Sequence, residues 1–131
     1  MGLIRTEATF WNPKLPDLEA VTTKALVDTG VRHLCVTQEL ADQLELKELR
    51  KQSVETADGV THTVPYVGPI QLEVCGRECF TGALVIGTEV LLGSVPMEDM
   101  DLWTSSARHQ ILPNPLSPDI PLSVAKGHRV L

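Results

Sequence analysis

An alternation of apolar and polar residues with a period of two runs through most of this chain and restricts it to a fold built mainly of strands. Successive side chains of a strand point to opposite faces of a sheet, so the alternation predicts strands with one buried face. The predicted strands cover residues 4–11, 18–27, 53–57, 60–64, 70–74, 79–86 and 90–92. Asp58-Gly59 lies between two of these runs and predicts a tight hairpin. Gly68-Pro69 predicts a further turn.

Two short helices are predicted between the strands. The first follows Thr37, whose hydroxyl suits the N-cap position, and its apolar residues repeat at helical spacing until the pattern fades by Leu49. The second begins near Pro96, because proline fits the first turn of a helix, and extends to Trp103. Asp101 and its acidic neighbours are assigned to a solvated face of this second helix.

The length of the chain, 131 residues, is typical of one domain. Residues 111–112 predict one more strand. Four prolines follow between residues 112 and 121, and a proline has no N–H to donate to a sheet or a helix. We therefore expect one domain over residues 1–112 and a Pro-rich C-terminal extension over residues 113–131, in the form of an extended arm.

Charge and cysteine content exclude several classes of function. The net charge is −6, and no basic run offers the positive charge that nucleic acid demands. No run of 18 apolar residues predicts a membrane span. The cysteine count is odd and the N-terminus lacks a secretory pattern, so we expect a cytoplasmic protein without a disulfide framework. Neither the Cys75-x3-Cys79 spacing nor the scattered histidines predict a metal site, and no Gly-rich phosphate loop predicts a cofactor.

The segment 25–30, Ala-Leu-Val-Asp-Thr-Gly, places a carboxylate where a fully apolar strand stops. Burying an ionised carboxylate is costly, so Asp28 needs partners, which Thr29 and Gly30 can supply through a hydroxyl and a close backbone. About sixty residues later a second apolar run ends at Gly93, again just before a predicted helix. Asp-Thr-Gly by itself also suits a local turn at the end of a strand, and this explanation stays open.

These two motifs, in this order and with a hairpin between them, resemble the retropepsin-like aspartic proteases, in particular their small prokaryotic single-domain members. The resemblance covers about residues 18–103. It implies a mainly β, acid-protease-like barrel, closed or partly open, with two short helices.

The resemblance also implies an aspartic endopeptidase that needs no cofactor and cleaves a peptide or protein substrate. Because the chain carries one Asp-Thr-Gly, it implies a homodimer in which each chain supplies one aspartate to activate water. Asp28 is then the catalytic residue. The resemblance implies that the active-site loop is supported by Thr29, Gly30, Leu91, Leu92 and Gly93. It implies that the flap over the substrate consists of Ala57, Asp58, Gly59 and Val60.

Val31 departs from the family pattern, which usually has Ser, Thr or Ala after Asp-Thr-Gly. A hydroxyl there would hydrogen-bond the ionised carboxylate, so its loss predicts a less acidic optimum of activity. Two alternatives remain at this point. The chain can be a catalytically inactive dimer of the same fold that binds or scaffolds an extended peptide. It can also be an unrelated β-domain in which Asp28 only caps a turn.

Overall fold

The computed structural model describes residues 3–126 and contains, over that range, nine strands and two short helices. The ends of the expected domain and extension, residues 1–2 and 127–131, lie outside the described residues. The elements in chain order are β1 (Arg5–Trp11), β2 (Val21–Val27), β3 (Leu34–Val36), α1 (Gln38–Gln43), β4 (Lys47–Glu55), β5 (Thr61–Val74), β6 (Arg77–Val85), β7 (Val90–Leu92), α2 (Ser94–Asp99), β8 (Leu102–Ser105) and β9 (Gln110–Pro113). The prediction of a mainly β fold with two short helices is confirmed.

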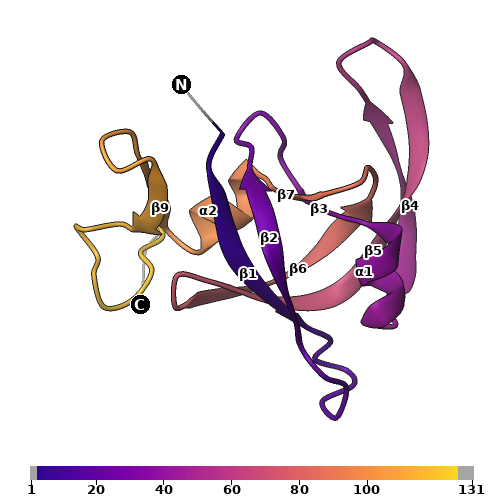
Figure 1. The fold of residues 1–131 in the computed structure, drawn as a ribbon, viewed down its shortest axis with the longest axis horizontal. Helices are drawn as coiled ribbons and strands as arrows, with labels where there is room; N and C mark the ends of the chain where they lie inside the picture. Colours follow the sequence, from indigo (N-terminus) through magenta and orange to yellow (C-terminus); the bar gives the residue numbers. More distant parts are fainter. Residues whose placement is uncertain (1–2, 127–131) are drawn as a thin grey trace.

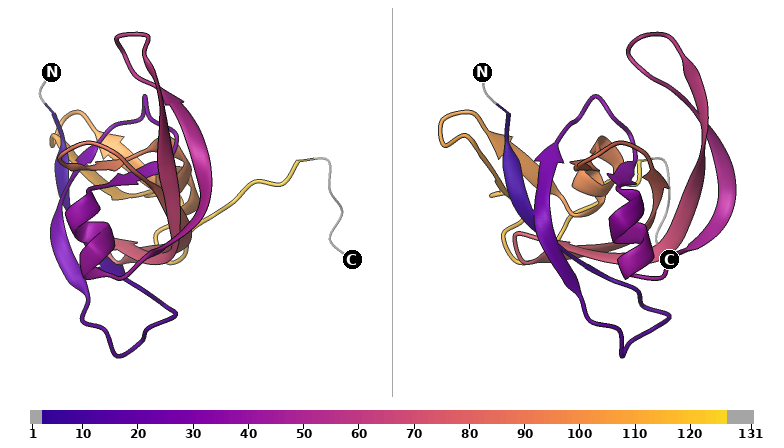
Figure 2. Two further views of the ribbon diagram at one scale, coloured as in Figure 1. Left: turned by 90° about the vertical axis from the view of Figure 1, so that its right-hand side faces the viewer. Right: turned by 45° about the vertical axis from the view of Figure 1, so that its right-hand side comes forward.

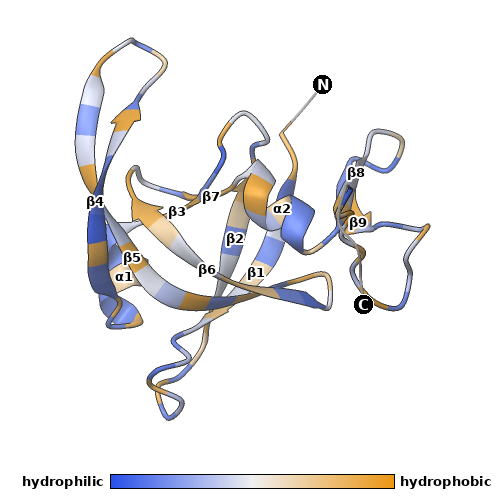
Figure 3. Cartoon of the chain, turned by 180° about the vertical axis from the view of Figure 1, so that it is seen from behind, coloured by the Kyte–Doolittle hydropathy of each residue, from blue (hydrophilic) through white to orange (hydrophobic). Residues whose placement is uncertain are grey.

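Six strands form a closed barrel in the order β1-β2-β7-β3-β6-β5, and a second pairing between β1 and β5 closes it (Figure 1). β4 pairs only with β5 and continues with it into a hairpin that rises beyond the barrel. β6 is hydrophilic at its start and hydrophobic at its end (Figure 3), where residues 82–85 are all buried. Phe10, Leu34, Leu72 and Leu92 are among the fully buried side chains of the barrel core.

The first helix is shorter than the sequence pattern predicts. The hydroxyl of Thr37 accepts the N–H of Leu40 at 3.1 Å, which confirms the expected N-cap. The helix ends at Gln43, and Glu45 then adopts a positive φ of 50° that turns the chain out of the helix. The prediction of helix up to Leu49 is wrong, because the backbone from Lys47 onward pairs along β5 instead.

β5 is one strand of 14 residues, although the sequence predicts two strands separated by a turn. The turn predicted at Gly68-Pro69 is wrong. A shift in the pairing with β6 between Val67 and Ile70 takes up these two residues, so the proline, which lacks an N–H, falls at an irregularity of the ladder. The strand therefore continues past Pro69 and spans both the hairpin and the barrel.

The second helix begins at Ser94 and ends at Asp99, before the predicted Trp103. Asp101 has a positive φ of 53°, and the chain turns there into β8, which pairs with β9 in a separate two-stranded sheet. Trp103 therefore belongs to a strand, whereas the strand predicted at residues 111–112 is confirmed within β9. Neither α1 nor α2, the two helices in the described part of the chain, has the length and apolar character needed to span a membrane.

The start of the Pro-rich segment is held to the barrel by a polar cluster around Asp101. Its carboxylate accepts hydrogen bonds from the side chain of Asn114 at 3.1 Å, from the N–H of Leu122 at 3.0 Å and from the hydroxyl of Ser117. Arg77, which is buried, lies 3.7 Å from the same carboxylate and donates to the carbonyl of Ser117. The assignment of Asp101 to a solvated helix face is thus wrong. Beyond this cluster the chain leaves the barrel (Figure 2).

We expect Asp101→Asn to release residues 114–122 at neutral pH, because the amide carries no charge for Arg77 and offers one acceptor oxygen in place of two. The wild type should show the same release in acid. The hydrogen bonds from Ser117, Leu122 and Asn114 hold the pKa of Asp101 below its usual range. The stabilisation is therefore complete at neutral pH and is lost as the pH falls through that lowered pKa.

Limited proteolysis followed by mass spectrometry measures this release. Asp119→Asn is the matched control, since Asp119 is exposed and lies in the same segment. Equal resistance of the Asp101→Asn variant and the wild type at neutral pH would contradict the prediction.

Candidate active site

Asp28 lies directly beyond the parallel pairing of β2 with β7. This pairing matches Ala25 with Val90 and ends where Val27 meets Leu92. The N–H of Asp28 then donates to the carbonyl of Leu92 at 3.0 Å. β2 pairs with β1 on one edge and with β7 on the other. Its last three residues are apolar, so the Asp28 carboxylate is the first polar side chain after the ladder.

The loop after Asp28 folds back on the carboxylate. The N–H of Gly30 donates to Oδ1 of Asp28 at 3.1 Å, and the N–H of Val31 donates to the Asp28 carbonyl at 3.2 Å. A Cβ on Gly30 would lie 3.2 Å from that same Oδ1, so glycine permits this close approach. The carboxylate is half-buried, whereas Thr29 and Gly30 are exposed.

The start of α2 is hydrogen-bonded to this loop. The first two N–H groups of α2 donate to the carbonyls of Val31 and Arg32 at 2.8 and 2.9 Å. A Cβ on Gly93 would lie 2.3 Å from the carbonyl oxygen of His33 and 2.6 Å from that of Val31. Only glycine fits at this position, so the Leu91-Leu92-Gly93 motif and the Asp28 loop are in contact, as a supporting role requires.

The Asp58-Gly59 step forms the tip of the β4–β5 hairpin, which confirms the predicted turn. Gly59 has a φ of 81°, a conformation that favours glycine. Oδ1 of Asp58 accepts the hydroxyl of Thr56 at 2.5 Å and the N–H of Val60 at 3.1 Å. These two hydrogen bonds, that of Thr56 first, hold the pKa of Asp58 below its usual range. The tip is therefore ordered by its own turn chemistry.

A cavity of about 710 Å³ lies between the Asp28 loop and this hairpin. Its lining includes Asp28 and Val31 from the loop, Val54 and Ala57 from the hairpin, and Leu84 and Leu91 from the barrel. The cavity thus brings together a single loop carboxylate and apolar side chains from three directions. Its lining suits a mainly apolar ligand that lies between the carboxylate and the hairpin.

Of the residues predicted for the site, the structure places Asp28, Gly30, Ala57 and Leu91 around this cavity. Leu92 and Gly93 are buried behind the loop, and residues 58–60 lie at the exposed hairpin tip. Val54 and Leu84 also line the cavity, although the sequence prediction does not include them in the site. The period-two pattern marks both as inward-facing, but it does not distinguish a core position from a cavity wall.

Val31 and Cys35 both belong to the apolar wall of the cavity. Val31 packs against a buried cluster that includes Cys35, Val64 and Leu84. Burial, and then the negative charge of Asp28, raise the pKa of Cys35 to about 11, so this thiol is neutral. The interpretation of Cys35 as a small core residue is confirmed. No hydroxyl occupies position 31 beside the carboxylate.

Thr29 faces a different space, a cavity of about 500 Å³ bounded by α2 and β8. Trp103 borders this cavity and is 44% exposed, although it is a large aromatic residue. The Asp28 loop therefore separates two hollows, an apolar one under the hairpin and an open one beside Trp103.

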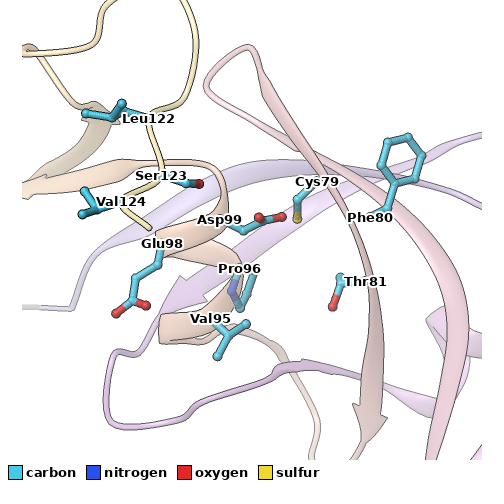
Figure 4. Close-up of a pocket in the computed structure, with 10 residues that line it drawn as sticks. All are labelled: Cys79, Phe80, Thr81, Val95, Pro96, Glu98, Asp99, Leu122, Ser123 and Val124. Carbon is cyan, nitrogen blue, oxygen red and sulfur yellow. The ribbon is translucent and has the colours of Figure 1, made fainter. Parts of the chain in front are cut away.

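A further cavity of about 620 Å³ lies between β6, α2 and the C-terminal segment (Figure 4). Cys79 of β6 and Asp99 of α2 both line it, and Figure 4 draws their side chains next to each other. Burial, and then the charges of Asp99 and Glu78, raise the pKa of Cys79 to about 12, so its thiol is unreactive at neutral pH. Asp28 is not part of this cavity. Over residues 3–126, no three His, Cys, Asp or Glu side chains gather in an arrangement that would hold a metal ion.

Comparison with known protein families gives one match. A family model described as aspartyl protease matches residues 17–93, which is more than half of the chain. The match includes Asp28, the hairpin and Gly93, and it ends before α2. No curated protein matches the chain.

We expect Gly93→Ala to lower the free energy of unfolding by about 3 kcal/mol, because the new methyl group would overlap two backbone carbonyls that cannot rotate away. Gly76→Ala is the matched control. A methyl group on Gly76 would have no atom within 4 Å, and the φ there is 77°, so this variant should cost only the strain of a left-handed alanine, about 1–2 kcal/mol. Denaturant unfolding measures both variants. Equal destabilisation would contradict the close contact at Gly93.

Proposed function

The chain belongs to the aspartyl protease family, and from this premise we propose that it is an aspartic endopeptidase that acts as a homodimer. The observation that carries the proposal is the place of Asp28, in the lining of an apolar cavity that residues of the hairpin also line. The unrelated β-domain in which Asp28 only caps a turn loses its support, because the family match spans both motifs.

In the proposed reaction the Asp28 side chains of two chains share one proton. The ionised carboxylate takes a proton from a water molecule, whose oxygen forms a bond to the carbonyl carbon of the peptide. The protonated carboxylic acid donates its proton to the carbonyl oxygen. The resulting tetrahedral intermediate returns a proton to the carboxylate pair, the amide nitrogen accepts one, and the C–N bond breaks. The pair ends with one proton, as it began.

The need for a second chain follows from the number of carboxylates near the reacting position. Besides Asp28, the lining of the cavity includes Glu55, but it belongs to the hairpin rather than to the loop. A twofold axis next to Asp28 would bring an identical carboxylate to the same place. Thr29 and Gly30 are exposed on the loop, and the half-exposed Trp103 lies next to the Thr29 cavity, which supports a partner on this side.

A dimer that binds peptides without cleaving them is the second candidate. Val31 favours it, because the residue that follows Asp-Thr-Gly packs into the apolar wall and offers the carboxylate no hydrogen bond. Both candidates share the ligand, an extended peptide that pairs with the hairpin backbone and places apolar side chains in the cavity. They differ in whether the bound peptide is hydrolysed.

Asp28→Asn decides between the two candidates. We expect the wild type to cleave members of a diverse peptide mixture between about pH 3 and 7, and the variant to lose at least about 100-fold in rate, since it lacks the acid–base pair. Mass spectrometry identifies the products.

Sedimentation establishes that both proteins are dimers at the concentrations used. If the wild-type dimer cleaves nothing while both proteins bind the same peptides, the chain is a binding module. If the protein is a monomer under every condition, the proposed catalytic pair does not exist.

Val31→Thr tests the pH dependence that position 31 predicts. Threonine nearly matches the volume of valine, and its hydroxyl can donate to the ionised carboxylate, which favours the charged form. We therefore expect the acidic limb of the pH–rate profile to move to lower pH. Val31→Ala is the control, because it removes volume without adding a donor. An equal shift in both variants would show that packing rather than hydrogen bonding sets the profile.

A further inference from the structure

Four side chains from three parts of the fold meet beside the hairpin, and we call them the basic cluster: Arg32, His33, Arg50 and Tyr66. The guanidinium of Arg50 lies over the Tyr66 ring, 4.5 Å from its centroid. His33 meets the same ring edge-on, with 6.0 Å between the ring centroids. Both arginines are exposed, whereas His33 and Tyr66 are half-buried.

The Tyr66 ring packs closely against the neighbouring strand β6. A Cβ on Gly82 would lie 2.4 and 2.5 Å from two atoms of the ring and 2.6 Å from the Tyr66 hydroxyl oxygen, so the ring rests directly on the backbone of β6. The pKa of His33 is lowered, first by burial and then by the positive charges of Arg32 and Arg50. The positive charges of the two arginines thus disfavour the cationic form of His33.

Neither arginine of the cluster is neutralised within the chain. The ion pairs of residues 3–126 involve Arg5, Lys51 and Arg77, and in that range no carboxylate lies within 4.0 Å of the Arg32 or Arg50 guanidinium. The two arginines lack these ion pairs although the chain has an excess of carboxylates, with a net charge of −6. Arg50 lies on the Tyr66 ring, His33 packs against the same ring and Arg32 precedes His33, so two arginines without a counterion adjoin one ring. Such an arrangement of like charges favours the binding of an anion.

The basic cluster adjoins the cavity under the hairpin. Arg32 follows Val31, which lines that cavity on the Asp28 loop. On β4, Arg50 shares a strand face with Gln52 and Val54, and Val54 lines the cavity. Four residues of strand separate Arg50 from Val54, or about 13 Å. An extended peptide in the cavity therefore reaches the cluster within about four of its own residues.

We propose that Arg32 and Arg50 form a subsite for an acidic side chain of the peptide, within about four residues of the scissile bond. The inference rests on the proposed function and names its substrate class, peptides with an Asp or Glu near the cleavage site. A guanidinium donates two parallel N–H groups to a carboxylate, and Tyr66 keeps that of Arg50 in place.

Paired peptides test the subsite. Each pair carries Glu or Gln at one position within four residues of a cleaved bond, with both ends blocked so that the side chain is the only variable. We expect kcat/KM to be about three- to tenfold higher for Glu at one position. The ratio should fall towards one in the R32Q/R50Q double variant and persist in part in R50K, which keeps the charge without the fork.

Lys14→Gln is the control for overall charge. Lys14 belongs to the loop between β1 and β2, which lies at the end of the molecule opposite the hairpin tip (Figure 1). The Lys14→Gln variant removes one positive charge and should leave the Glu-to-Gln ratio of kcat/KM unchanged. A ratio near one at every position in the wild type would overturn the subsite while the peptidase proposal stands.

Binding separates a failure of the subsite from a failure of the peptidase. Fluorescence anisotropy with labelled Glu and Gln peptides, on the wild type and on Asp28→Asn, reports affinity without turnover. If no peptide is cleaved but Glu peptides bind more tightly through the two arginines, the peptidase proposal fails and the subsite stands. If neither cleavage nor binding favours Glu, the subsite is overturned.

Discussion

The parallel pairing of β2 with β7 is the contact on which the rest of this molecule depends. It places two apolar strands side by side in the barrel and ends where the N–H of Asp28 meets the Leu92 carbonyl. A shift of one residue in this pairing would turn the side chains to the opposite faces and carry the carboxylate away from its cavity. Gly93, the residue that follows β7, then lets the loop after Asp28 approach its backbone. The barrel and the candidate site thus share one piece of backbone.

Local rules account for the parts of the fold that the sequence predicts well. Strands such as β1 follow from alternation, because one face lies in the core and the other is exposed. The hairpin tip follows from Asp58-Gly59, whose conformation and hydrogen bonds lie within five residues. The two motifs of the retropepsin-like pattern are equally local, and the family match covers both. For this reason the sequence alone singles out Asp28 as the candidate catalytic residue, and its catalytic role is the proposal made above.

Non-local partners account for the rest. Residues 47–49 fit the end of a helix until β5 supplies a strand to pair with. Gly68-Pro69 has the composition of a turn, but the ladder with β6 absorbs it as an irregularity. The partners of Asp101 include residues 13 and 21 positions further along the chain. Arg50 and Tyr66 meet because β4 lies against β5. No short window of sequence shows such contacts, since each depends on a segment elsewhere in the chain.

The contacts of α2 and Gly93 with the loop after Asp28 fix the position of the loop without involving its side chains. Every contact described between them is made by main-chain atoms, the carbonyls of residues 31–33 on one side and backbone N–H groups or the bare glycine on the other. Such contacts do not depend on which side chains the loop carries. Residues 31 and 32 can therefore change during evolution, and with them the lining of the cavity, while the Asp28 carboxylate stays where the barrel puts it.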